Sequence, residues 1–176
     1  MNQKVINVCF NEETFINKHK TIYKYYFSKV RVIYLIHTSL AVLIVIAGTR
    51  IDDDAPFPIA TLIGVMYCLY VVYFWSAFFN NRRKYFTHIK RYADKYQRMD
   101  MSYSLSVSDT NIIYKDEEKS YTFIWGLFKP IVEYQGLLLL VSKETDQTLM
   151  SISKDEVGEA EYRQLFTTLK EKVGNL

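Results

Sequence analysis

The sequence is poor in the residues that mark several protein classes. Its 176 residues include two cysteines, Cys9 and Cys68, with three prolines and six glycines. Two cysteines are too few for a disulfide scaffold or a cysteine-rich zinc module. The low proline and glycine content, with an apolar fraction of 49 %, excludes collagen-like, low-complexity and intrinsically disordered chains. The formal net charge of +3 is too small to indicate a nucleic-acid-binding protein.

Charge is missing from two long stretches. Residues 32–49 and 55–81 contain no Asp, Glu, Lys or Arg. As helices rising ~1.5 Å per residue, the first would span about 27 Å and the second could exceed the roughly 30 Å hydrocarbon core of a bilayer. A buried hairpin of a soluble bundle would keep a polar face, which neither stretch has. We therefore predict a transmembrane hairpin over residues 32–81, with spans at about 32–49 and 57–79. The polar and basic residues before it argue against a cleaved signal peptide.

The flanking charges predict the orientation of this hairpin. Residues 1–31 carry six basic and two acidic side chains, and residues 82–98 carry seven basic and one acidic. The connector, residues 50–55, carries one basic and three acidic side chains. Because cationic flanks stay on the cytoplasmic side, both termini are expected in the cytoplasm. We expect a multi-pass protein of the cell (inner) membrane, in contact with the lipid bilayer.

Both flanks carry helical patterns of apolar residues. The segment 1–31 reads as a strand followed by an amphipathic helix that begins after Asn11, a good N-cap residue. Residues 82–98 read as a basic, amphipathic juxtamembrane helix. These two helical segments either pack on each other as a stalk or lie in the headgroup region.

From about residue 99 the pattern changes to short β-rich segments separated by polar or glycine-containing breaks. This predicts a meander of about six antiparallel strands. Ser153 and Glu156 form a capping-box pattern that starts a C-terminal helix. The alternating residues 5–10 are expected to add a strand to this sheet, because an isolated strand is unstable. The predicted fold class is an α+β membrane protein, with a two-helix transmembrane hairpin and a small antiparallel β domain (residues 99–176) closed by a C-terminal helix.

The β-rich region contains a set of mostly apolar motifs around one Trp. These are Phe123–Ile124–Trp125, Ile131–Val132–Glu133, Leu137 to Leu140, Ile152 and Lys154. With the order of the elements, they resemble the YcxB-like family of bacterial membrane proteins, whose C-terminal part resembles a pleckstrin-homology-like fold. The resemblance covers essentially the full chain, and Ser153 stands where the family usually has a proline. It implies a fold and a membrane location, and no activity.

The titratable residues argue against catalysis. His19 lies on a helical apolar stripe, His37 inside the first span and His88 among basic residues, and the chain has no HExxH, GxSxG, CxxC or glycine-rich phosphate motif. The serines at 102, 104, 106 and 108 are expected to face water, and Asp116–Glu117–Glu118 to form a solvated turn. We predict no catalytic, cofactor-binding or metal-binding residues, and hence a protein that is not an enzyme.

Three other features carry alternatives. A cluster of five basic residues after the second span either sets topology only or binds anionic lipid headgroups. Ala60 and Gly64 have the small-xxx-small spacing that allows close helix packing, within the hairpin or between protomers. His37 is either a hydrogen-bonded neutral side chain or a functional group at membrane depth. The cluster consists of Arg82, Arg83, Lys84, Lys90 and Arg91.

The function expected from these features is a protein-interaction or scaffold module held at the membrane. Residues 99–176 carry eight basic and thirteen acidic side chains, a balance unfavourable for an acidic membrane or nucleic acid. A protein partner of unknown identity is therefore expected, and no nucleic acid. The alternatives are an immunity-type protein against a membrane-active toxin and an anionic-lipid-associated homo-oligomer.

Overall fold

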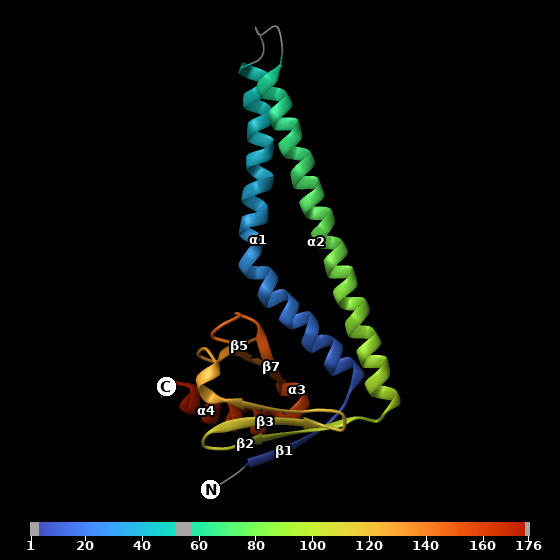
Figure 1. The fold of residues 1–176 in the computed structure, drawn as a ribbon, viewed down its shortest axis with the longest axis vertical. Helices are drawn as coiled ribbons and strands as arrows, with labels where there is room; N and C mark the ends of the chain where they lie inside the picture. The colour runs from blue at the N-terminus through green and yellow to red at the C-terminus, as the bar shows by residue number, and fades with distance from the viewer. Residues whose placement is uncertain (1–3, 52–57, 175–176) are drawn as a thin grey trace. The chain divides into compact units, whose positions relative to one another are not determined.

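The chain forms two compact units, one of which is built from both ends of the sequence. The computed structural model describes residues 4–51 and 58–174. Unit 1 comprises Met1–Ile22 and Ile89–Leu176, and unit 2 comprises Tyr23–His88 (Figure 1). The elements in chain order are β1 (Lys4–Cys9), α1 (Glu12–Ile51), α2 (Ile59–Arg98), β2 (Ser102–Val107), β3 (Asn111–Asp116), β4 (Ser120–Ile124), the 3₁₀ turn η1 (Trp125–Leu127), β5 (Val132–Tyr134), β6 (Leu137–Val141), β7 (Thr148–Ser153), α3 (Lys154–Val157) and α4 (Glu159–Gly174).

The apolar stretches and their amphipathic flanks form two continuous helices of 40 residues each. The Asn11 side chain caps α1, because its Oδ1 accepts a hydrogen bond from the Thr14 amide at 2.9 Å. Glu12 and Glu13 place negative charge at the positive end of the helix dipole. Both helices are long and apolar enough to cross a membrane. Arg50 and Ile51, predicted in the connector, extend α1, and the predicted start of the second span at residue 57 lies outside the described residues.

Within unit 2, α1 and α2 are closest next to the connector and separate from there until α1 bends and turns back towards α2 (Figure 1). A Cβ atom on Gly48 would lie 2.8 Å from the Ala60 carbonyl carbon, and one on Gly64 would lie 3.0 Å from Val45 Cα. Farther along, aromatic rings fill the widening space. Their centroids are 4.5 Å apart for Tyr34 and Phe74, and 5.0 Å apart for Phe27 and Phe78. Residue size thus matches the separation of the helices.

Unit 1 contains two antiparallel sheets, in the orders β1-β2-β3-β4 and β5-β6-β7. Strand β1 pairs with β2 from Lys4↔Val107 to Cys9↔Ser102. The expected addition of the N-terminal strand to the sheet is therefore confirmed. It places a strand from before the long helices beside the first strand that follows them.

The core of unit 1 lies between the sheets and α4. All five residues of β6 are buried, and α4 contributes Tyr162, Leu165, Leu169 and Val173 at helical spacing. Full burial of each Leu side chain stabilises the unit by roughly 1.5–3 kcal/mol.

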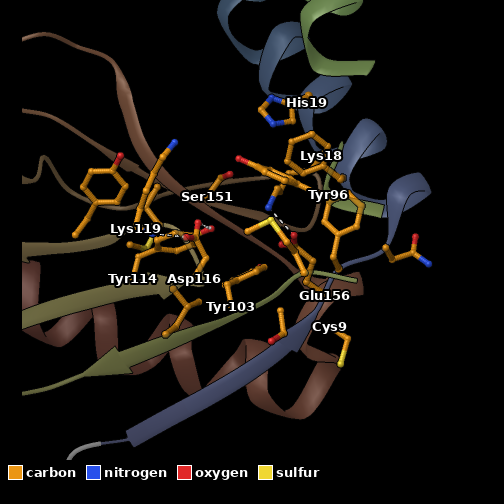
Figure 2. Close-up of a pocket in the computed structure, with 18 of the residues that line it drawn as sticks. Cys9, Lys18, His19, Tyr96, Tyr103, Tyr114, Asp116, Lys119, Ser151 and Glu156 are labelled. Atoms are coloured by element: carbon orange, nitrogen blue, oxygen red, sulfur yellow. Dashed lines mark hydrogen bonds and ion pairs between the residues drawn. The ribbon is translucent and has the colours of Figure 1, made fainter. Parts of the chain in front are cut away.

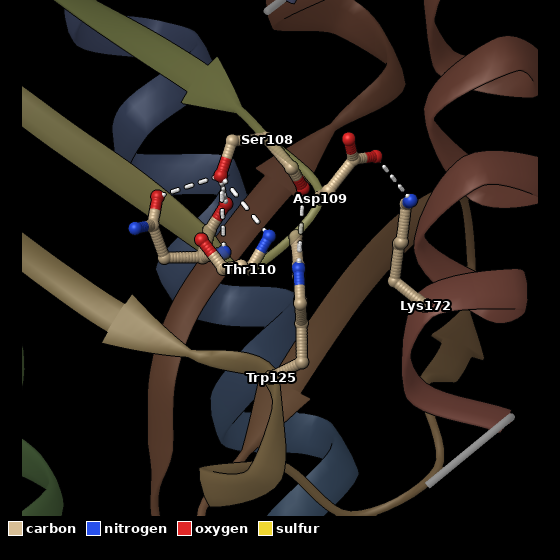
Figure 3. A network of polar contacts seen from close by, with 6 residues as sticks. Ser108, Asp109, Thr110, Trp125 and Lys172 are labelled. Carbon is tan, nitrogen blue, oxygen red and sulfur yellow. Dashed lines mark hydrogen bonds and ion pairs between the residues drawn. The ribbon is translucent and has the colours of Figure 1, made fainter. Parts of the chain in front are cut away.

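A polar network closes the core at the β2–β3 turn (Figure 3). The indole Nε1 of Trp125, which is 4 % exposed, donates to the Ser108 carbonyl at 3.2 Å. Ser108 Oγ accepts from the Asn111 amide, and Lys172 of α4 pairs with Asp109 at 2.7 Å. The turn, the Trp and the C-terminal helix are thereby held together.

The predicted single meander is wrong, because the strands divide into two sheets. The chain leaves the first sheet through η1, between β4 and β5. After η1, only Val132–Tyr134 of the segment 128–134 forms a strand, while Phe128 makes an isolated bridge with Ser142. Pro130 has no amide hydrogen to donate to a ladder, which limits pairing here.

Two further local expectations need correction. The capping box forms, with Ser153 Oγ accepting from Asp155 N and Ser153 N donating to Glu156 Oε2. However, α3 ends after four residues at Gly158, whose φ of +81° breaks the helix before α4. Ser106, expected to face water, is only 9 % exposed.

Candidate binding pocket

Unit 1 contains a cavity of about 540 Å³, a size typical of ligand sites (Figure 2). Its walls come from the first turns of α1, the last turns of α2, strands β2, β3 and β4, and the start of β7 and α3. Segments from before and after the long helices therefore meet in one pocket. Most of the residues lining it are apolar or aromatic.

A cluster of three rings forms one wall. The centroid of Phe10 lies 5.4 Å from that of Phe15 and 5.6 Å from that of Tyr96. The Phe10 amide donates to the Met101 carbonyl at 3.0 Å, which holds the turn between β1 and α1 against the start of β2. Edge-to-face packing of this kind fixes the orientation of the rings as well as burying them.

A buried ion pair lies at the base of the pocket. Lys18 Nζ lies 2.5 Å from Glu156 Oε1, and the two side chains are 9 % and 8 % exposed (Figure 2). The other carboxylate oxygen, Oε2, accepts from the Ser153 amide in the capping box. Both oxygens of Glu156 are thus engaged, one with α1 and one with the start of α3. Removing either partner of such a pair leaves an uncompensated buried charge.

His19 follows Lys18 on α1 and lines the same pocket. Its ring packs on Phe15 with centroids 4.5 Å apart. Burial, assisted by the Lys18 cation, lowers the pKa of His19 from its ordinary 6.5 to about 4. The imidazole is therefore neutral near pH 7.

Tyrosines of β2 and β3 also line the pocket. The Tyr103 and Tyr114 rings have centroids 5.3 Å apart. Burial, with the Glu156 carboxylate, raises the pKa of Tyr103, and burial, with Asp116, raises that of Tyr114. Both tyrosine hydroxyls are therefore protonated at neutral pH. Tyr114 Oη donates a hydrogen bond to Asp116 Oδ2 at 3.0 Å.

The β3–β4 turn forms one side of the pocket mouth. Asp116 Oδ1 accepts from the Glu118 and Lys119 amides, at 2.8 and 2.6 Å, so this aspartate shapes the turn as well as contacting Tyr114. The principal acids of the pocket are thus bonded to Lys18, to a tyrosine or to backbone amides. In the described part of the chain, no group of three or more His, Cys, Asp and Glu residues is placed to hold a metal ion. The arrangement is suited to binding an apolar or aromatic group.

The residues predicted as sites lie elsewhere. Arg82, Arg83 and Lys84 are exposed in unit 2, whereas Lys90 and Arg91 are exposed in unit 1. Within residues 4–51 and 58–174, none of the five makes an ion pair. Ala60 and Gly64 face α1 of the same chain, at Gly48 and Val45.

His37 is half-buried in unit 2, within a small polar group. Its Nδ1 is 2.6 Å from Tyr67 Oη, and Trp75 Nε1 donates to Thr38 Oγ1 at 3.0 Å. The His37 side chain is therefore hydrogen-bonded across the two helices.

Sequence reasoning missed the pocket, because its wall residues come from segments that read separately as strand, helix stripe and turn. A signal was present in the aromatic residues Phe10, Phe15, Tyr96 and Tyr103, which lie on both sides of the long helices in sequence. Comparison of the chain with protein-family models, with curated proteins and with solved structures finds no match.

Proposed function

We propose that the chain is a non-enzymatic, membrane-anchored binding module, whose pocket in unit 1 receives an apolar side chain of a partner protein. The two antiparallel sheets and the C-terminal helix support a pleckstrin-homology-like fold for unit 1. Together with the two long helices they support a YcxB-like membrane protein. The basic flanks support a cytoplasmic position for both termini, and hence for the pocket.

The surface of the long helices supports the membrane anchor. In the most apolar 18-residue windows of α1 and α2, only 6 % and 11 % of the residues are buried. A helical hairpin in the core of a soluble protein would be mostly buried, whereas these faces are exposed and apolar over many turns. Such a surface has a lower free energy in the hydrocarbon core of a bilayer than in water.

The pocket is the observation that carries the binding proposal. Its acids are already bonded within the protein, and its walls are rings, so binding energy would come from apolar contact. Apolar surface continues beyond the cavity onto the rim, where Tyr121 is 47 % and Leu149 is 40 % exposed. A protein side chain in the cavity, with its backbone over this rim, would cover both, as in a hot-spot contact.

Site-specific photocrosslinking in cells tests this proposal. A photoreactive residue replaces Leu149 at the rim, and a matched control replaces Thr167, which is exposed on α4 away from the pocket. We expect a discrete crosslinked protein from position 149 and none from position 167. Equal capture from both positions would contradict the proposal, and capture of this chain alone would identify a homo-oligomer.

Alkaline carbonate extraction of cell membranes tests the anchor separately. A chain held by two spans stays in the membrane pellet, because extraction would expose both apolar helices to water. Release of the full chain into the supernatant would contradict membrane insertion, whatever the crosslinking result.

A further inference from the structure

Unit 2 contains a second cavity, of about 400 Å³, between α1 and α2. It is bounded by Tyr23 and Tyr34 of α1 and by Phe74, Phe78, Arg82 and Tyr85 of α2. Tyr34 lies near the start of the first predicted span, and Phe78 near the end of the second. Arg82 lies about one helical turn beyond Phe78. The cavity therefore lies where the two predicted spans leave the hydrocarbon core.

Arg82 is the cation of this cavity. Its Cζ lies 5.8 Å from the Tyr23 ring centroid and 6.0 Å from that of Phe86, so the guanidinium is positioned by rings. Within the described residues it makes no ion pair. A guanidinium has five N–H donors in a fork that matches two oxygens of a phosphate. Ring contacts position the group without using those donors.

The surroundings of Arg82 favour an anion. The sequence has no Asp or Glu at residues 14–51 or 55–93. The charged side chains of α1 and α2 within unit 2 are therefore all basic, and their fields add at the cavity. Burial raises the pKa of Tyr23 and that of Tyr85, so both hydroxyls are protonated and able to donate.

Arg82 differs in its position from the two basic residues that follow it. Arg83 and Lys84 do not line the cavity, although all three are exposed and adjacent in sequence. If the cluster served only to set topology, the three side chains would be interchangeable. A binding site between the helices would depend on Arg82.

We propose that this cavity binds the phosphodiester group of an anionic phospholipid, with Arg82 as its main ligand and the Tyr23 hydroxyl as a second donor. One acyl chain would lie against the rings of Phe74 and Phe78 where they border the cavity. A lipid is favoured over free phosphate because the walls are aromatic and the cavity lies at the expected membrane surface. This inference rests on the proposed membrane anchor.

Native mass spectrometry of the full chain in mild detergent tests the site. Bound lipid is compared after addition of phosphatidylglycerol or phosphatidylcholine, for the wild type and for Arg82→Gln and Arg83→Gln. We expect the wild type and Arg83→Gln to retain phosphatidylglycerol in preference to phosphatidylcholine. Arg82→Gln should bind phosphatidylglycerol roughly fivefold less or weaker still, as expected for loss of one well-placed cation. Equal losses in the two variants, or no lipid preference in the wild type, would overturn the proposal.

Two controls make the result specific. Tyr23→Phe keeps the ring and removes only the hydroxyl, so a smaller, roughly twofold loss of phosphatidylglycerol is expected. Inorganic phosphate should not displace the lipid, and displacement at millimolar concentration would assign the cavity to free phosphate instead. Arg82→Lys, which keeps the charge, should restore part of the binding and shows that the site remains folded.

Failure of this proposal is distinguishable from failure of the anchor. If the chain resists carbonate extraction but its lipid binding does not depend on Arg82, the membrane anchor stands and only the lipid site is rejected. A chain that carbonate releases has no anchor, whatever lipid it binds in detergent.

Discussion

At the scale of single residues, the Lys18–Glu156 pair connects α1 to the capping box of α3 across the base of the pocket. Such a pair is weak evidence for net stability, because both ions lose their hydration on burial. Removing one partner is destabilising, since the remaining buried charge is still desolvated but no longer has an opposite charge beside it.

The first prediction concerns this pair. Glu156→Gln keeps the size of the side chain but leaves the Lys18 cation buried without a counter-ion, so the free energy of unfolding should fall by about 3–5 kcal/mol. The control is Glu159→Gln, which removes an exposed partner of Lys154 and Arg163 and should lower the free energy of unfolding much less, because solvent screens exposed ion pairs. Chemical denaturation of the full chain in detergent measures both. Equal losses would show that the buried pair has no special cost.

The second prediction concerns pH. Because folding lowers the pKa of His19 to about 4, the folded state favours the neutral imidazole. The resulting stabilisation is fully present above pH 6.5 and is lost as the pH falls from 6.5 towards 4, amounting to at most about 3 kcal/mol. In His19→Gln this part of the pH dependence should disappear, whereas His88→Gln, at an exposed position, should retain it. Thermal melts between pH 4 and 8 measure the difference, and identical profiles for His19→Gln and wild type would rule out this role.

At the scale of elements, α1 and α2 use two kinds of contact. Small residues allow backbone contact next to the connector, and rings fill the wider part of the gap. In lipid, where no hydrophobic force acts between helices, such fit would be a main source of their association. Gly48 is therefore a sensitive position, because its missing Cβ is opposite backbone atoms that do not move aside.

The third prediction follows from this contact. Gly48→Ala adds a methyl group 2.8 Å from the Ala60 carbonyl carbon, which should force the helices apart at a cost of about 1–3 kcal/mol. The larger change Ala47→Leu, at the exposed neighbouring position, should change stability by less than about 0.5 kcal/mol. Thermal unfolding in detergent compares the two. A greater effect of the position 47 variant would place the interface on another face of α1.

At the scale of the whole molecule, the chain leaves unit 1 within α1, after Ile22, and returns to it within α2, at Ile89. Strand β1 is the partner that β2 needs on one edge, and it contributes Ile6 and Val8 to the core. Unit 1 therefore cannot complete its first sheet from residues 99–176 alone, the range expected for the β domain.

The fourth prediction tests this dependence. Val8→Ala, at a side chain that is 2 % exposed, should destabilise unit 1 by about 2 kcal/mol. Val5→Ala, at a side chain on β1 that is 55 % exposed, should have little effect. Hydrogen exchange should report faster exchange of the β2 and β3 amides in Val8→Ala alone. Unchanged exchange would mean that the sheet is stable without the contribution of β1.

Much of the fold could be predicted where the determinants are local. Both long helices, the cap at Asn11, the capping box at Ser153 and six strands after residue 99 follow from hydropathy, periodicity and turn chemistry within a few residues. The break at Gly158 and the division at η1 could not be predicted in the same way. Both depend on where the chain must turn to cover the core, which the local pattern does not contain.

By itself, the sequence determined that two uncharged stretches become long apolar helices, because charge and hydropathy act residue by residue. It also determined that basic residues flank these helices, with Arg82 as one of several adjacent cations. The cavity between the helices, which Arg82 lines and Arg83 and Lys84 do not, arises only from tertiary contacts. The tertiary structure alone paired Lys18 with Glu156, 138 positions apart, and closed the ring-lined pocket around them. The physical reason is that burial and cavity shape arise from contacts between distant segments, which a linear pattern of residues does not contain.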